Sequence, residues 1–172
     1  MTLNTLSEIE IECRRQIESC LYTSTTLYIW LRTVRFARFA SVVAPLLLSG
    51  LAALGLTKFN FPNSVVVSLT FFASIFPALQ YALKIETSIE HIAGEASKYK
   101  ALQDRFRQVS KIGISLGNEV ALREFGEAME QLNLARSSSI TPPERYFRKA
   151  QAKIKSGDYD FSIDSSGDTI LI

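Results

Sequence analysis

The sequence has few of the residues from which metal sites and disulfide frameworks are built, because its 172 residues include one histidine and two cysteines. A zinc site needs three or four protein ligands, so His91 without a CxxC motif predicts no metal. Cys13 and Cys20 are too few for a disulfide framework. Their seven-residue spacing puts both on one helix face, where we expect them to pack in a core. Palmitoylation and redox sensing are the alternatives.

Motifs for catalysis and phosphate binding are also missing. The segment GISLG (113–117) lacks the Lys-Ser/Thr pair that completes a phosphate-binding loop. Asp158, Asp160 and Asp164 lack the central glycine and the closing glutamate of a calcium loop. A net charge of +2 without a long Lys/Arg run gives no indication of nucleic-acid binding. We therefore expect a protein that is not an enzyme, has no cofactor and binds no nucleic acid.

The most informative absence is that of charge between residues 39 and 83, where Lys58 is the only charged side chain. A helix over residues 39–57 is about 28 Å long, close to the hydrocarbon thickness of a bilayer. Neither apolar segment shows the polar stripe of a soluble amphipathic helix, so a buried hairpin in a soluble bundle is the weaker alternative. The sequence predicts an all-α membrane protein. It is expected to form a two-helix transmembrane hairpin (38–57 and 64–84) with a cytosolic N-terminal helix and a C-terminal helical region.

Basic residues predict the orientation of this hairpin. The link over residues 58–63 is so short that both chain ends lie on one side. Four basic residues flank the spans on that side, against one lysine in the link: Arg32, Arg35, Arg38 and Lys84. The positive-inside rule places them in the cytoplasm, which predicts a multi-pass protein of the inner (plasma) membrane with N-in and C-in topology. We expect the same four side chains to contact lipid head groups.

The second span has a mildly polar face. Small and hydroxyl-bearing residues at helical spacing let helices approach closely, and they can also line a pore. Each span contains one proline, Pro45 or Pro77, which favours a kink that serves either packing or gating. The candidate pore-lining or helix-packing residues are Thr70, Ser74, Ala78 and Tyr81.

Both spans are flanked by helical patterns. Residues 5–37 predict an amphipathic helix that enters the membrane, which TSTT (23–26) is expected to weaken or break. The second span is expected to continue without a break into a helix with one apolar and one charged face, and the charged face includes Glu95. A one-sided stripe needs a partner, either residues 5–30 of this chain or the same helix in another copy. We name it the oligomerisation stripe: Ile85, Ile89, Ile92, Ala96, Tyr99, Leu102 and Phe106.

The C-terminal part predicts two further helices. Gly113 and Gly117 should loosen or end the helix of the stripe, and another helix is expected near 118–135. A last helix should start at Pro143, run to about Lys155 and stop at Gly157. Residues 85–157 would thus be cytosolic helices within one domain (1–157). The tail 158–172 alternates in polarity like a strand, and we interpret it as a docking or partly disordered segment.

The layout resembles the SLATT family of two-transmembrane effectors. It has an N-terminal helix, two spans with a very short turn, the charged helix IETSIEHIAGEASKYKALQDRFRQ and a small helical C-terminal part. Within that helix, the segment with Ala96, Tyr99 and Leu102 is the most similar. The resemblance covers most of residues 7–155 and rests on layout rather than on a signature motif, so it brings no catalytic residue.

The resemblance implies a role in bacterial antiphage defence. A partner protein would make or sense a nucleotide signal, and the effector would form a homo-oligomer that permeabilises the inner membrane and kills the infected cell. The alternative is a two-span anchor or scaffold that recruits a cytosolic partner through residues 85–155 without forming a pore.

Overall fold

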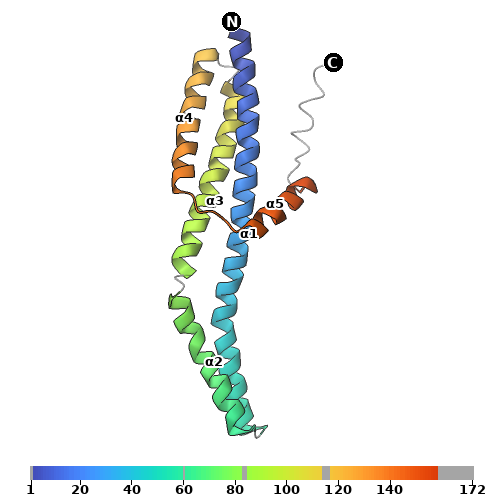
Figure 1. Ribbon diagram of the computed structural model, residues 1–172, viewed down its shortest axis with the longest axis vertical. Coiled ribbons are helices and arrows are strands. Elements are labelled where there is room, and N and C mark those ends of the chain that lie inside the picture. Colours follow the sequence, from blue (N-terminus) through green and yellow to red (C-terminus); the bar gives the residue numbers. More distant parts are fainter. Residues whose placement is uncertain (1, 60, 83–84, 114–116, 159–172) are drawn as a thin grey trace. The chain divides into compact units, whose positions relative to one another are not determined.

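The computed structural model describes residues 2–59, 61–82, 85–113 and 117–158. All regular structure in these ranges is helical, which confirms the all-helical fold class. The elements are α1 (Thr2–Thr57), α2 (Asn63–Ala82), α3 (Ile85–Gln108), the π-helical turn η1 (Val109–Gly113), α4 (Asn118–Ser138) and α5 (Glu144–Lys155) (Figure 1).

The chain divides into two compact units. Unit 1 consists of Met1–Trp30 and Ile92–Ile172, and unit 2 consists of Leu31–His91. Helix α1 contributes its N-terminal part to unit 1 and its C-terminal part to unit 2. The division follows the composition of the chain, because the two long uncharged segments, 39–57 and 59–83, both fall in unit 2.

Unit 1 has a helical core drawn from α1, α3 and α4. Each helix buries one stripe of residues at three- and four-residue spacing, which is the pattern of helices packed side by side. Phe106 and Leu132 are among the largest fully buried side chains. The buried apolar residues of these helices in unit 1 are Ile9, Cys13, Cys20, Leu27, Ile92, Ala96, Tyr99, Leu102, Phe106, Ala121, Ala128, Leu132 and Ala135.

Helix α1 runs through TSTT without a break, so the expected interruption at residues 23–26 is wrong. The hydroxyl groups bond back to the helix backbone: Thr23 Oγ1 donates to Ser19 O at 2.9 Å and Thr26 Oγ1 donates to Tyr22 O at 2.7 Å. Ser24 Oγ likewise donates to Leu21 O at 3.2 Å. Because such bonds satisfy hydroxyl groups inside the helix, Ser24 and Thr26 can be buried in unit 1.

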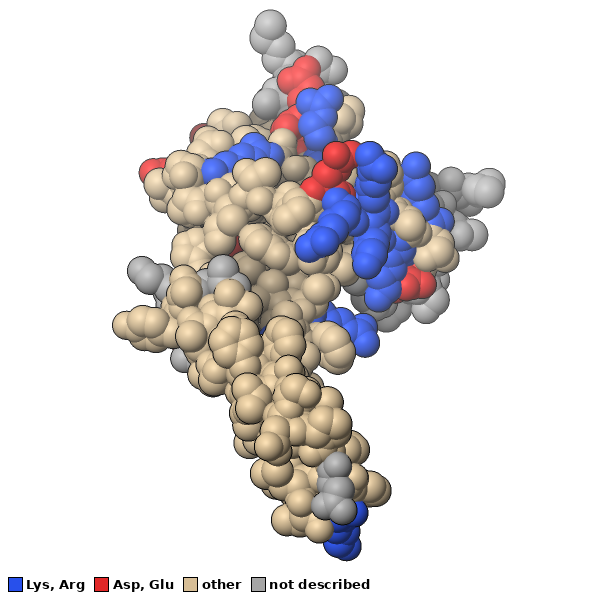
Figure 2. All heavy atoms as spheres, turned by 60° about the horizontal axis from the view of Figure 1, so that its bottom comes forward, with Lys and Arg blue, Asp and Glu red and all other residues tan. Residues whose placement is uncertain are grey.

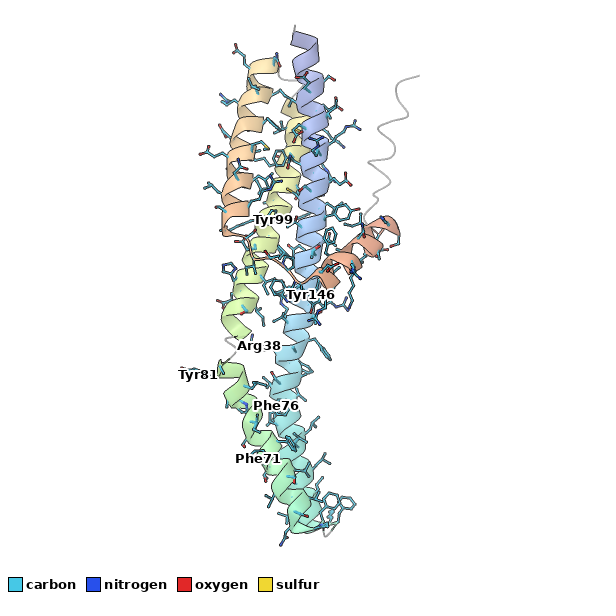
Figure 3. All side chains as sticks on the ribbon, in the orientation of Figure 1. Arg38, Phe71, Phe76, Tyr81, Tyr99 and Tyr146 are labelled. Carbon is cyan, nitrogen blue, oxygen red and sulfur yellow. The ribbon has the colours of Figure 1, made fainter. Side chains whose placement is uncertain are left out.

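Helix α5 packs on α1 within unit 1. Tyr146 is 3% exposed and its ring lies 6.3 Å from that of Trp30 (Figure 3). The ring of Phe147 lies 6.1 Å from that of Tyr22. These aromatic pairs and the fully buried Ala150 hold one face of α5, and its other face is exposed.

The ends of the later helices follow the sequence signals. Helix α5 stops at Lys155, and Gly157 adopts φ +82°, as a C-terminal glycine should. Helix α4 ends at Ser138, three residues beyond the expected end.

Helix α3 gives way to η1 and then to residues 114–116, which lie outside the described residues. The expected continuity between span and stripe falls on residues 83–84, and the expected tail strand on residues 159–172; both are outside as well.

In unit 2, a tight turn links the C-terminal part of α1 to α2, which lies antiparallel beside it (Figure 1). The amide of Phe61 donates to Gly55 O at 2.9 Å, and the amide of Lys58 donates to Leu54 O at 2.9 Å. The ring of Phe61 covers Gly55, which is buried: a Cβ at residue 55 would lie 2.9 Å from Phe61 Cγ. The turn therefore needs glycine at residue 55 for close approach rather than for an unusual φ.

A Gly55→Ala variant should loosen this turn. The added methyl group must displace the Phe61 ring, and overpacking of this kind costs about 1–3 kcal/mol. Hydrogen exchange at the Phe61 amide should accelerate by roughly 5- to 150-fold, the equivalent of that cost. Gly50→Ala is the matched control, because nothing lies within 4 Å of a Cβ at residue 50. Equal exchange rates in the two variants would contradict the role of Gly55.

Candidate functional site

The hairpin of unit 2 presents an apolar surface, and Lys58 is the only charged residue between residues 39 and 83. One helix, Ser7–Thr57, is long and apolar enough to cross a membrane, and 11% of its most apolar window is buried; the apolar part of α2, Asn63–Leu79, is shorter. Figure 2 shows few Lys, Arg, Asp or Glu side chains on the visible face of the hairpin. Its exposed large hydrophobic residues are Phe36, Phe39, Val42, Leu46, Leu47, Leu51, Leu54, Leu56, Phe59, Phe61, Val65, Val67, Phe71, Phe72, Ile75, Leu79 and Tyr81.

The four candidate residues of α2 all lie on its exposed side. Tyr81 is 89% exposed and points away from α1 (Figure 3), and Thr70, Ser74 and Ala78 are exposed as well. They therefore do not make the contact between α1 and α2 within one chain. The half-buried side of α2 carries apolar residues at helical spacing instead: Val66, Leu69, Ala73 and Phe76.

The hydroxyl groups on this exposed face are satisfied by their own helix. Thr70 Oγ1 donates to Val66 O at 2.9 Å, and Ser74 Oγ donates to Phe71 O at 2.8 Å. Satisfied hydroxyl groups can face an apolar environment at little cost, yet they can turn towards water or a second chain. The face is thus mildly polar and unoccupied by the chain's own described residues.

The arginines before the apolar part of α1 are solvent-exposed. Arg32, Arg35 and Arg38 are all exposed on unit 2. Arginine suits phosphate because its planar fork donates two parallel hydrogen bonds. Lys84, the fourth residue of the predicted head-group set, lies outside the described residues.

Most of the oligomerisation stripe is buried in unit 1, so of the two partners expected for it, this chain itself covers the stripe. Ile92, Ala96, Tyr99, Leu102 and Phe106 are 0–5% exposed in the core of unit 1. A face covered by the chain's own helices cannot pack against a second copy while unit 1 stays folded. The stripe also contains Ile89, which is 8% exposed in unit 2. The side chain of Ile85 lies outside the described residues.

Sequence periodicity assigned Glu95 to the charged face, but this residue is 3% exposed. Glu95 Oε1 accepts a hydrogen bond from Lys98 Nζ at 2.8 Å, and Oε2 has no hydrogen-bond partner among the described residues. A second buried polar group, Gln16, accepts from Arg136 at 2.9 Å and so links α1 to α4. No sequence signal distinguishes these two residues from exposed polar neighbours.

Unit 1 has a groove between α3 and α4 with a volume of about 450 Å³. Its lining is largely apolar and includes Leu102, Ala135 and Leu134, and Leu134 is 64% exposed. Lys98 and Arg105 also line the groove, but each already forms an ion pair with a carboxylate. Arg105 lies 2.8 Å from Glu127 and 3.4 Å from Glu124, and Lys98 lies 2.8 Å from Glu95. The groove therefore suits an apolar side chain of a partner better than an anion.

The described residues contain no group of three or more His, Cys, Asp or Glu side chains that could hold a metal ion. His91 is exposed. Cys13 and Cys20 are buried in unit 1, as expected for core residues.

No known protein family, curated protein or solved structure matches the chain. The surface of unit 2 is therefore the main guide to function.

Proposed function

We propose that the chain crosses the bacterial inner membrane twice, with both ends in the cytoplasm, and oligomerises to permeabilise that membrane. The spans are residues 38–57 and 64–84. In this proposal the protein is a SLATT-like effector of an antiphage system, in which a partner makes or senses a nucleotide signal.

The observation that carries the proposal is the exposed apolar surface of unit 2. Soluble monomers rarely expose contiguous apolar patches beyond a few hundred Å². Leu46, Phe71 and their neighbours on the hairpin are exposed on both helices, and no charged residue interrupts either helix between Phe39 and Thr57 or between Asn63 and Ala82. Such a surface is stable in a hydrocarbon environment, whereas a buried core helix would have its apolar residues covered.

The dimensions of the helices support two crossings. Helix α2 has 20 residues, and at about 1.5 Å rise per residue such a helix matches the hydrocarbon thickness of about 30 Å. The exposed Arg32, Arg35 and Arg38 supply the positive charge expected on the cytoplasmic side. One lysine, Lys58, marks the turn on the opposite side.

We place oligomerisation on α2 because its polar face is not covered by other helices of the chain. The stripe on α3 is buried, whereas the face with Thr70, Ser74 and Ala78 is exposed. Small residues allow a neighbouring hairpin to approach closely, and the hydroxyl groups could turn towards water in a pore. A ring of hairpins joined through this face would place Ser74 at the pore.

Dye release from liposomes tests the proposal. The purified full chain, reconstituted at high protein-to-lipid ratio, should release a trapped small dye. Ser74→Phe should lower release at least tenfold because it fills the proposed pore face. Ser68→Phe is the matched control: Ser68 is also exposed and also bonds its own backbone (Ser64 O, 2.8 Å), yet it lies about 120° away around the helix. Absence of release under every condition, or equal loss in both variants, would contradict the pore.

The groove of unit 1 favours a second candidate function, a two-span scaffold that recruits a cytosolic partner. Leu134 is 64% exposed in that groove and could accept an apolar partner segment. Exchanging residues 38–84 for an unrelated hairpin separates the two functions. A scaffold should keep partner recruitment after the exchange, whereas a pore-former should lose permeabilisation.

A further inference from the structure

Helix α5 concentrates the positive charge of the chain. Its 12 residues contain five basic residues and one acidic residue, a net charge of +4. The whole chain is only +2, so the remaining residues sum to −2. Figure 2 shows Lys and Arg side chains gathered on one side of unit 1. The basic residues of α5 are all exposed: Arg145, Arg148, Lys149, Lys153 and Lys155.

The orientation of α5 follows from its buried side. Tyr146 and Ala150 are 3% and 0% exposed and lie on the packed side of the helix, so Arg148, Lys149 and Lys155 lie on the other side. Lys153 shares the side of Tyr146, and the guanidinium group of Arg145 lies 4.8 Å above the Tyr146 ring. Carboxylates neutralise this face only in part. Arg148 pairs with Glu144 at 2.7 Å and Lys153 pairs with Asp158 at 3.6 Å. Lys149 has no ion-pair partner among the described residues.

An exposed aromatic ring borders the basic face. Phe147 is 45% exposed on α5, and its ring lies 6.1 Å from that of Tyr22 on α1. Aromatic rings at the edge of a basic helix are typical of a membrane–water interface, where the ring enters the head-group region. Trp30, against which α5 packs, precedes Phe39 at the start of the uncharged segment by nine residues of the same helix.

We propose that the exposed face of α5, formed by Arg145, Arg148, Lys149 and Lys155, binds the anionic head groups of the cytoplasmic leaflet. The proposal rests on the proposed membrane location of the chain. Charge complementarity selects the ligand: a net charge of +4 on one helix attracts an anionic surface. The exposed Phe147 favours a lipid surface over a nucleic acid. Each basic residue near such a surface strengthens binding by about fivefold.

Fluorescence quenching of a label on α5 tests this surface. Ala152 is exposed on α5, and the native cysteines are buried, so Ala152→Cys can be labelled selectively in the full chain. Neutral acrylamide serves as the quencher, since its access does not depend on lipid charge. Quenching should be at least threefold weaker in vesicles with 30% phosphatidylglycerol than in pure phosphatidylcholine. Salt at 0.5 M should abolish the difference because it screens the charges.

Two charge variants provide the comparison. Changing Arg145, Arg148, Lys149 and Lys155 to glutamine should remove the protection by anionic lipid. A control with the same loss of four charges, placed on α1, α3 and α4 instead, should keep it: Arg14→Gln, Arg15→Gln, Lys100→Gln and Arg123→Gln. Circular dichroism checks that both variants fold.

The outcomes separate the two proposals. Equal quenching in both kinds of vesicle, or equal loss in both variants, overturns the α5 surface whether or not the chain inserts. Protection of the detergent-solubilised chain by polyuridylate as strong as that by anionic vesicles also overturns it, in favour of a nucleic-acid surface. Insertion is scored separately by resistance to alkaline carbonate extraction. A chain extracted from neutral vesicles contradicts the membrane-spanning function, whereas charge-dependent protection at residue 152 would still support the α5 surface.

Discussion

A Phe106→Ala variant should lose about 3–5 kcal/mol of the free energy of unfolding of unit 1, the cost of removing a large buried aromatic side chain. Phe106 is 0% exposed and its ring meets that of Phe125 edge-on, with centroids 6.1 Å apart. Truncation leaves a cavity where α3 meets α4 and removes this aromatic contact. Because small domains have little stability in reserve, we expect the variant to be partly unfolded at 37 °C.

Denaturant titration of the detergent-solubilised chain measures this loss. Trp30 is the only tryptophan and packs on Tyr146 within unit 1, so its fluorescence reports the unfolding of unit 1. Leu122→Ala is the control, because Leu122 is a neighbour of Phe125 in sequence but is 55% exposed. A loss below about 1 kcal/mol for Phe106→Ala, within the usual range of surface substitutions, would show that the stripe is not the core of unit 1.

The two cysteine thiols should be about 100-fold less reactive in the folded chain than in the unfolded chain. Burial raises the pKa of Cys13 from 9.0 to about 11, with a further contribution from the carboxylates of Glu12 and Glu10. Burial also raises the pKa of Cys20 to about 11, against an opposing effect of Arg136. Thiolate is the reactive form, and two pKa units reduce its population by about 100-fold at pH 8. Labelling with a maleimide at pH 8, with and without denaturant, measures the ratio.

The same shifts predict that unit 1 loses stability at alkaline pH. The unfolded thiols ionise near pH 9.0, whereas the folded thiols keep their protons until about pH 11. Above pH 9 the unfolded chain therefore binds fewer protons than the folded chain, so the free energy of unfolding falls as the pH rises from 9 to 11. Below pH 9 the two thiols keep their protons in both states, so they do not make the free energy of unfolding depend on pH. In a Cys13→Ala/Cys20→Ala variant, the free energy of unfolding should fall less steeply between pH 9 and pH 11. Fast labelling of the folded chain would contradict the burial and restore palmitoylation or redox sensing as functions.

The sequence by itself determined which segments are helical and where charge is absent. The all-helical class, the end of α5 before Gly157 and the turn before Asn63 follow from local signals, because glycine, proline and periodicity act on their own neighbours. The uncharged segments 39–57 and 59–83 were equally clear from the sequence, because composition does not depend on tertiary contacts.

Only the tertiary structure decided what covers each face. Periodicity showed that Ile92 and Phe106 share a stripe, but a stripe can be buried by its own chain or by a second copy, and the structure buries it in unit 1. Glu95 was predicted to be exposed but is buried. Residues at the edge of a stripe are buried or exposed according to the neighbouring helix, which local sequence does not specify.

The candidate site illustrates the same limit. The sequence identified Thr70, Ser74, Ala78 and Tyr81 as one face of α2, and the structure left that face exposed by packing the opposite side of α2. The basic helix α5 was visible in the sequence as a helix, but its exposed cationic face depends on the packing of Tyr146 on Trp30. These residues are 116 positions apart, and a contact over such a separation arises only when the chain folds.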